Sequence, residues 1–196
     1  SACDPLADWQ YLSVAEAFEQ YCGIDILATA PDPLKPETAL LLAEAQRVGV
    51  RIDPEDQWDE IFFRLFLEKI EPNLGIETPT ILYDWPLSMA ALARQSPDDE
   101  RVAERFEIFA CGVELANGFG ELTDATEQRR RFEAEVARKH EIAGYSYPID
   151  DDFLDALATG MPEASGIALG FDRLVMLCAG VESIEDVLWA PVVTIG

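Results

Sequence analysis

The sequence predicts an α+β fold in which helices flank an antiparallel β-sheet. Three helix-like patterns come first, β-rich stretches follow between residues 78 and 122, and helices with one further strand close the chain. Helices and strands grouped in this way, without repeating β-α-β units, are typical of an antiparallel sheet with helices packed beside it. The length of 196 residues suits one domain, or one domain with a helical appendage.

Capping and termination signals predict the three early helices. The stretch 12–23 opens with Ser13 and Glu16, which have the spacing of a capping box, and ends at a glycine. The second helix, 36–49, begins with proline and ends with glycine. The third, 54–75, carries an apolar stripe that indicates a face in the core. The stripe consists of Trp58, Ile61, Phe62, Leu65 and Phe66.

Strand and helix signals are mixed in the rest of the chain. A β-type run at 78–86 ends in proline, and β-forming residues dominate 105–122, where Gly112 and the pair Asn117-Gly118 signal turns. The other expected elements are a polar connection at 96–100, a long helix at 124–144 capped by Asp124, a helix at 151–161, a strand at 165–170 and helical pieces at 171–180 and 183–190.

Acidic residues dominate the charge balance. Thirty-eight Asp and Glu residues against 14 Lys and Arg residues give a net charge of −24. Binding to nucleic acid needs clustered Lys and Arg, so a broad tRNA contact by this chain is not expected. A solvated acidic surface is the simpler interpretation of the charge.

Rare residues exclude several kinds of site. His140 is the only histidine, so a His-rich zinc centre is excluded, and no motif supports a Ser-His-Asp or Cys-His nucleophile. The four cysteines have no CxxC spacing and are expected to be reduced thiols of a cytoplasmic protein. No apolar run has membrane-spanning length and no secretory leader is recognisable, so we expect no membrane association.

A tight turn at Asn117-Gly118 would bring two acids together. A two-residue turn there would pair Glu114 with Glu121 across two strands, where like charges repel. Two interpretations remain open. The carboxylates are solvated on a surface hairpin, or a cation such as Mg²⁺ lies between them, since Mg²⁺ binds through one or two carboxylates together with phosphates.

The segment 164–177 predicts a strand, a glycine turn and a helix. We expect Asp172 to cap this helix, which puts Arg173 in the first turn, where a cation opposes the helix dipole. A bound polyphosphate would reconcile the arginine with its position, because helix N-termini and guanidinium groups both bind phosphate. The alternative is a surface arginine paired with a neighbouring acid. A triphosphate with Mg²⁺ would account for Arg173 and the acid pair together.

Two segments resemble a known family. Residues 105–133 (RFEIFACGVELANGFGELTDATEQRRRFE) and 160–177 (GMPEASGIALGFDRLVML) resemble the C-terminal part of a class II lysyl-tRNA synthetase catalytic domain. The second segment is similar to the third signature motif of class II synthetases. The resemblance is closer to their paralogues, the elongation factor P–(R)-β-lysine ligases of the GenX/PoxA group. It extends more weakly to 12–25 and 78–93, and so covers nearly the whole chain.

The resemblance implies the class II synthetase fold and an ATP-dependent activation of lysine or β-lysine as an adenylate. The acyl group then passes to a lysine of elongation factor P instead of tRNA. Carried over by position, Glu114, Leu115, Gly170 and Arg173 bind ATP, with Arg173 also in the catalytic role. The implied amino-acid contacts are Asn117, Glu121 and Ala168, and the implied Mg²⁺ ligands are Glu114 and Glu121.

The alanine at position 168 stands where synthetases usually have glycine. Its methyl group is expected to shift preference from α- to β-lysine, only partially, because one methyl is worth about 1–3 kcal/mol of discrimination. Gly120 replaces a polar residue of the relatives, which predicts a missing hydrogen bond on the substrate side.

Two signature motifs of the family are not recognisable in the chain. Motif 1 forms the dimer interface of the family and motif 2 supplies an arginine for the α-phosphate. We therefore expect residues 1–196 to be a partial catalytic domain, with a mainly helical insertion and a strand at 11–95 and the motif 3 core at 101–196. The full-length protein would be a homodimeric enzyme and the isolated chain inactive. A fragment of a lysyl-tRNA synthetase, or a non-catalytic module that binds ATP or a partner, remain alternatives.

Overall fold

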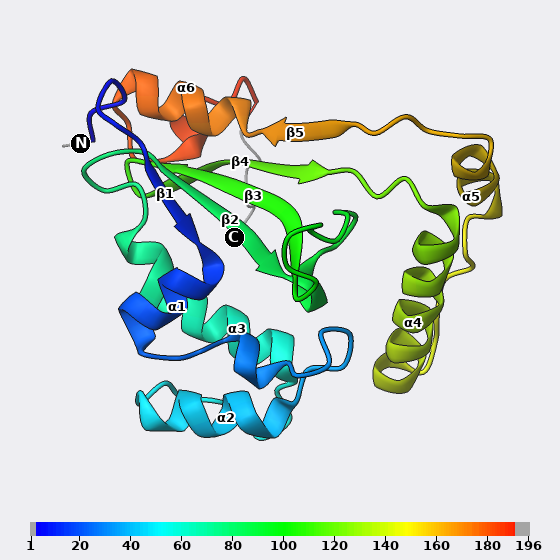
Figure 1. The fold of residues 1–196 in the computed structure, drawn as a ribbon. Helices are drawn as coiled ribbons and strands as arrows, with labels where there is room; N and C mark the ends of the chain where they lie inside the picture. Colours follow the sequence, from blue (N-terminus) through cyan, green and yellow to red (C-terminus); the bar gives the residue numbers. More distant parts are fainter. Residues whose placement is uncertain (1–2, 191–196) are drawn as a thin grey trace.

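A five-stranded sheet lies at the centre of the computed structural model, which describes residues 3–190 (Figure 1). The strands lie side by side in chain order: β1 (Gln10–Ser13), β2 (Thr80–Pro86), β3 (Val102–Ala110), β4 (Val113–Gly120) and β5 (Ser165–Leu169). Only the β1–β2 pair of this sheet is parallel. The expected α+β class is confirmed, but β1 is not predicted, since four residues are too short for a periodic signal.

Six α-helices accompany the sheet in the described part of the chain. They are α1 (Val14–Cys22), α2 (Thr38–Arg47), α3 (Trp58–Leu65), α4 (Ala125–Ala143), α5 (Asp151–Ala158) and α6 (Phe171–Ala179). In Figure 1, α1, α2 and α3 lie together below the sheet and α6 lies above it. The helices α4 and α5 form a pair at the right, joined to the sheet by the extended segments after β4 and before β5.

Short-range capping sets several helix ends as predicted. Ser13 and Glu16 form the capping box of α1, and Gly23 ends that helix in the left-handed conformation. The Asp124 carboxylate accepts hydrogen bonds from two backbone amides at the start of α4. The predicted cap of α6 is wrong. Gly170 is the N-cap and Asp172 lies inside the first turn, because the chain already turns into the helix after β5.

The predicted helix 54–75 is broken into three parts. After α3 the backbone widens into a π-helical segment, Phe66–Ile70, and then tightens into a 3₁₀ turn, Glu71–Asn73. Pro72 has no N–H to continue α-helical hydrogen bonding. The π segment keeps Phe66 and Ile70 in the core, where both are buried.

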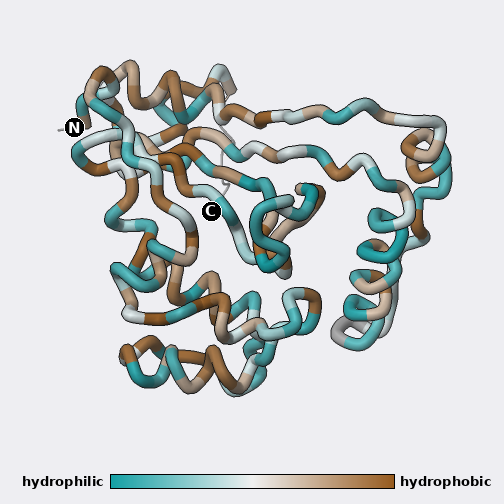
Figure 2. The backbone as a smooth tube through the Cα atoms, in the orientation of Figure 1, coloured by the Kyte–Doolittle hydropathy of each residue, from teal (hydrophilic) through white to brown (hydrophobic). Residues whose placement is uncertain are grey.

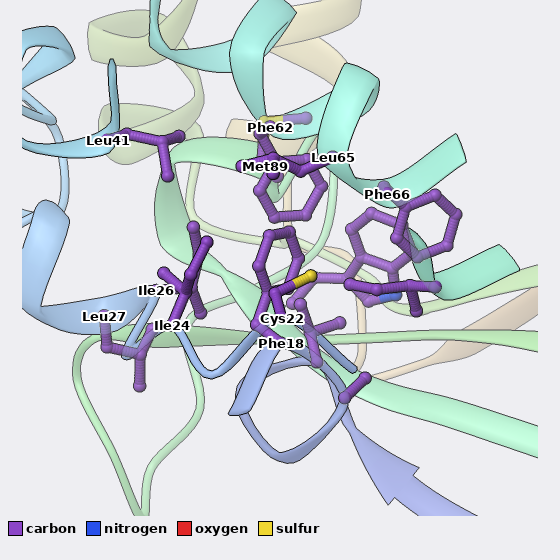
Figure 3. Packing of buried hydrophobic residues seen from close by; sticks show 14 of the residues in the cluster. Phe18, Cys22, Ile24, Ile26, Leu27, Leu41, Phe62, Leu65, Phe66 and Met89 are labelled. Carbon is purple, nitrogen blue, oxygen red and sulfur yellow. The ribbon is translucent and has the colours of Figure 1, made fainter. Parts of the chain in front are cut away.

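One apolar core joins the helices α1–α3 to a face of the sheet. Phe62 of α3 lies between Phe18 of α1 and Trp85 of β2, with ring centroids 4.8 and 5.9 Å away. Figure 3 shows Phe18, Phe62 and Phe66 converging in this layer. Hydrophobic colouring runs along these central elements, whereas α4 is mostly hydrophilic (Figure 2). The predicted core role of the α3 stripe is confirmed, since all five members are buried.

The opposite face of the sheet is also apolar, and it is exposed at its two edge strands. One row in register crosses all five strands through Tyr11, Ile81, Ile108, Ala116 and Leu169. Tyr11 is 68% exposed and Leu169 52% exposed. An apolar patch of this kind is typical of a surface that another structure covers.

The turn between β3 and β4 lies at Cys111 and Gly112, and the predicted turn at Asn117-Gly118 is wrong. Both Cys111 and Gly112 have positive φ, at 57° and 73°. Asn117 and Gly118 lie inside β4 and are paired with strands on both sides. Gly118 is needed for space, since a Cβ atom there would overlap the Phe106 ring on the neighbouring strand.

Candidate active site

Glu114 lies on β4 and Glu121 directly follows the same strand, so the two side chains do not face each other across a strand pair. Glu114 pairs with Phe109 near the start of β4, and Glu121 follows the end of β4 with a bridge to Ala93. Seven residues at about 3.3 Å each separate them by roughly 20 Å. A single cation cannot lie between two carboxylates at that distance, so the expected shared site at Glu114 and Glu121 is wrong.

Arg173 contacts Glu114 at the start of α6. Its Nη1 donates to the Glu114 backbone carbonyl at 2.7 Å and to the carboxylate at 3.2 Å. The Gly170 amide donates to the Leu115 carbonyl at 2.8 Å, which fixes the α6 N-terminus beside β4. Four of the predicted residues, Glu114, Leu115, Gly170 and Arg173, therefore meet at one point. The interpretation of Arg173 as an arginine paired with a neighbouring acid also holds in this structure.

Asn117, Ala168 and Glu121 lie further along the same face. Asn117 pairs with Ala168 of β5, and residues that pair directly project to the same side of a sheet. The Asn117 Oδ1 atom is buried with no hydrogen-bond partner among the described residues. At Gly166 an added Cβ would lie 2.6 Å from Glu121 Oε1, so the glycine leaves room for that carboxylate.

Glu107 on β3 also belongs to this face, and the sequence patterns did not predict it. It lies opposite Asn117 and is buried, with its carboxylate accepting a hydrogen bond from Arg105 Nη2 at 2.8 Å. A glutamate within the apolar run "RFEIF" is the signal that could have identified it, because a buried carboxylate needs a partner.

The environment of Glu107 raises its pKa to about 7. Burial is the main cause, and the Glu114 carboxylate adds to it, whereas the Arg105 guanidinium opposes it. Glu114 pairs with Phe109, two residues after Glu107 on β3, so the two carboxylates lie on adjacent strands at the same face and form the acidic pair of the site. A cation beside them would relieve the repulsion.

We expect this carboxylate to make folding of the cation-free chain pH-dependent. The pKa of Glu107 is higher in the folded state, so the folded state binds more protons between the ordinary value of 4.5 and about 7. Stability therefore falls as pH rises through this range. Relative to Glu107→Gln, the wild-type chain should lose about 2–3 kcal/mol of unfolding free energy.

Urea unfolding at pH 5, 6, 7 and 8 measures this difference. The control is Glu104→Gln, which removes a more exposed carboxylate from the same strand. Parallel pH profiles of the wild type and Glu107→Gln would contradict the expectation.

Gly120 does not lie on the substrate side, as was expected from the family pattern. It alternates with Phe119 and Glu121 and so projects to the opposite face, where a Cβ atom would overlap Glu104, the ion-pair partner of Arg94. The expected loss of a substrate hydrogen bond is therefore wrong.

The donor set suits a magnesium ion that is shared with a ligand. No group of three or more His, Cys, Asp or Glu side chains that could hold a metal occurs among residues 3–190. Magnesium is usually bound by one or two carboxylates together with substrate phosphates, which matches Glu107 and Glu114 beside Arg173. A cavity of about 780 Å³ lies between α4 and the segments around Trp58 and Ser88, and none of these residues lines it. No helix within residues 3–190 combines the length and apolarity of a membrane span.

The mostly antiparallel sheet, with an arginine in the first turn of the helix after β5, agrees with the class II synthetase fold that the sequence resemblance implies. Residues 6–194 match the family described as tRNA synthetases class II (D, K and N). The chain belongs to this family. The reactions of class II synthetases use ATP.

Relatives with more specific names match almost the whole chain. The elongation factor P–(R)-β-lysine ligase of Proteus mirabilis is 46% identical over 181 residues, which are 92% of this chain and 54% of the relative. The ligases of Salmonella dublin and Salmonella enteritidis are 44% identical over 186 residues, 95% of this chain and 55% of each relative. The chain thus spans about half the length of these relatives.

Proposed function

We propose that the full-length protein is an ATP-dependent ligase that attaches lysine or β-lysine to a lysine side chain of elongation factor P. The names of the relatives support this assignment, as does the position of Asn117, Ala168 and Glu121 along the β4–β5 pair. In the first half-reaction the amino-acid carboxylate attacks the α-phosphate of ATP and pyrophosphate leaves. In the second, the acceptor amine attacks the acyl carbon and AMP leaves.

The proposed ATP subsite lies where β4 meets α6. Arg173 supplies a planar cationic fork for phosphate, and the main chain at Leu115 and Gly170 forms the wall beside it. Glu107 and Glu114 would hold Mg²⁺, which would neutralise phosphate charge when bound. Arg173 would exchange its contact with Glu114 for the phosphate.

The proposed amino-acid subsite lies along β4 and β5. The unpartnered Asn117 carbonyl oxygen and the Glu121 carboxylate are acceptors that suit the ammonium groups of a lysine-type substrate. The Ala168 methyl group, directly opposite Asn117, would narrow the pocket and favour the β isomer.

The observation that carries this proposal is the contact between Arg173 and Glu114. It joins the third family motif to the acidic pair on β3 and β4, and so brings a phosphate-binding cation and cation-binding carboxylates to one site.

ATP–pyrophosphate exchange by the full-length gene product, with lysine and with (R)-β-lysine, tests the function. We expect exchange with at least one isomer, transfer to elongation factor P, and a loss of about tenfold or more in Glu114→Gln, because a metal and arginine partner is removed. Glu133→Gln, on the exposed surface of α4, is the matched control and should retain wild-type exchange.

Other outcomes would favour another function. Transfer to tRNA instead of elongation factor P would favour a lysyl-tRNA synthetase. No amino-acid-dependent exchange with either isomer would favour a non-catalytic module. The 196-residue chain alone is expected to give no exchange above background.

A further inference from the structure

Arg105 is held from several sides at the edge of the core. Its Nη1 donates to the Met89 carbonyl at 2.7 Å and its Nη2 to Glu107 Oε1 at 2.8 Å. The guanidinium carbon lies 4.1 Å from the centroid of the Trp85 ring and 5.9 Å from that of Phe119. The side chain is only 12% exposed. An arginine fixed by two hydrogen bonds and an aromatic plate has little freedom to move.

We propose that Arg105 is a positioning residue that orients the Glu107 carboxylate toward a divalent cation. The inference rests on the proposed function, because it needs the cation beside Glu107 and Glu114. Within residues 3–190, the Glu107 side chain has one hydrogen bond, and it joins Oε1 to Arg105. Oε2 is therefore the oxygen left for a ligand.

The aromatic core determines where the guanidinium lies. Trp85 contacts Phe62 and Phe66, with ring centroids 5.9 and 5.6 Å away, so the aromatic ring beneath Arg105 belongs to the packed core between the helices and the sheet. Arg105 and Glu107 are two positions apart on β3 and so project to the same face. A ligand side chain supported by strands and by outer hydrogen bonds keeps its geometry better than one on a loop.

The charge of Arg105 also permits a second acid at this point. Glu107 is buried and interacts with the Glu114 carboxylate, so it needs a cation nearby before any metal binds. Lysine could supply a charge, but a single ammonium group cannot reproduce the planar fork that bonds Met89 and Glu107 while it stacks on Trp85. Geometry, beyond charge, is the predicted contribution of Arg105.

Arg105→Met and Arg105→Lys in the full-length gene product test this role. Arg101→Met is the control, since Arg101 is on the same part of the chain but exposed and paired with Asp99. The primary readout is binding of Mn²⁺, as a probe for the divalent cation, in the presence of ATP, followed by electron paramagnetic resonance. The second is the KM for Mg·ATP against the KM for the amino acid, and thermal unfolding reports the folded fraction.

We expect Arg105→Met to weaken Mn²⁺ binding about tenfold, the scale found when supporting residues of metal ligands are removed. The KM for Mg·ATP should rise while that of the amino acid changes less. Arg105→Lys should still bind Mn²⁺ roughly threefold or more weakly than the wild type, and Arg101→Met should bind Mn²⁺ as the wild type does.

Three results would overturn the proposal: unchanged Mn²⁺ affinity in folded Arg105→Met, complete recovery in Arg105→Lys, or an equal rise of both KM values. If Arg105→Met does not fold, the Mn²⁺ affinity of Arg105→Lys decides between the same outcomes. Failure of the proposed function is distinguishable, since it would appear as absent exchange in the wild type, whatever the Mn²⁺ affinities of the variants.

Discussion

Replacing Arg173 with alanine in the full-length gene product should lower kcat/KM for ATP by about 10²–10³-fold, or roughly 3–4 kcal/mol of transition-state stabilisation. The side chain is 46% exposed and lies in the first turn of α6, where it contacts Glu114. A cation in the first turn opposes the helix dipole, so this position is unfavourable unless an anion binds there. The triphosphate is the anion that the proposed site provides, and alanine removes its planar donor.

Pyrophosphate exchange at varied ATP concentrations measures this loss. Arg173→Lys should fall between wild type and alanine, because an ammonium group keeps the charge but not the bidentate geometry. Arg129→Ala is the matched control, since Arg129 is similarly exposed and also paired with one acid, Asp151. Wild-type kcat/KM in Arg173→Ala, or an equal loss in Arg129→Ala, would show that Arg173 only pairs with Glu114.

The residues near Arg173 could be predicted because they lie in two continuous segments with strong motif spacing. Gly170 and Arg173 are set by the strand–glycine–helix pattern, and Leu115 follows Glu114 directly. The structure brings them together through one backbone bond and one arginine contact.

Glu107 could not be found in the same way. Its position among apolar residues is the one local signal, but its burial depends on neighbouring strands, where it pairs with Leu82 of β2 and Asn117 of β4. The error at Asn117-Gly118 has a related cause. Asn-Gly is a strong turn signal in isolation, but Gly118 is required by the Phe106 ring across the strand pair. Tertiary packing outweighed the local propensity.

Element type was predictable where periodicity was long, and boundaries were not. The α1 capping box and the α3 stripe consist of residues at fixed spacings that can be recognised in the sequence. The π segment after Leu65 is not, because the α-helical and π-helical spacings differ by one residue and the choice follows from which side chains the core accepts. β1 forms only because β2 offers a parallel partner some seventy residues later.

Phe62→Ala should destabilise the folded chain by about 3–5 kcal/mol. Phe62 is fully buried, and its ring has aromatic neighbours in Phe18, Trp58 and Phe66 at 4.8, 5.4 and 6.2 Å. It joins α1 and α3 to Trp85 of the sheet, so the space left by alanine cannot be filled by one neighbour alone (Figure 3). Since domains have only about 5–15 kcal/mol of stability, this is a large fraction of the total.

Phe63→Ala is the internal control for the Phe62 prediction. The two phenylalanines are adjacent on α3, but Phe63 is 40% exposed and meets the Phe62 ring only edge-on, at 5.6 Å. Its loss should cost about 1 kcal/mol or less. Urea unfolding of the 196-residue chain, followed by tryptophan fluorescence, gives both values. Equal destabilisation by the two variants would contradict the core described above, and with it the rigid plate that Trp85 provides beneath Arg105.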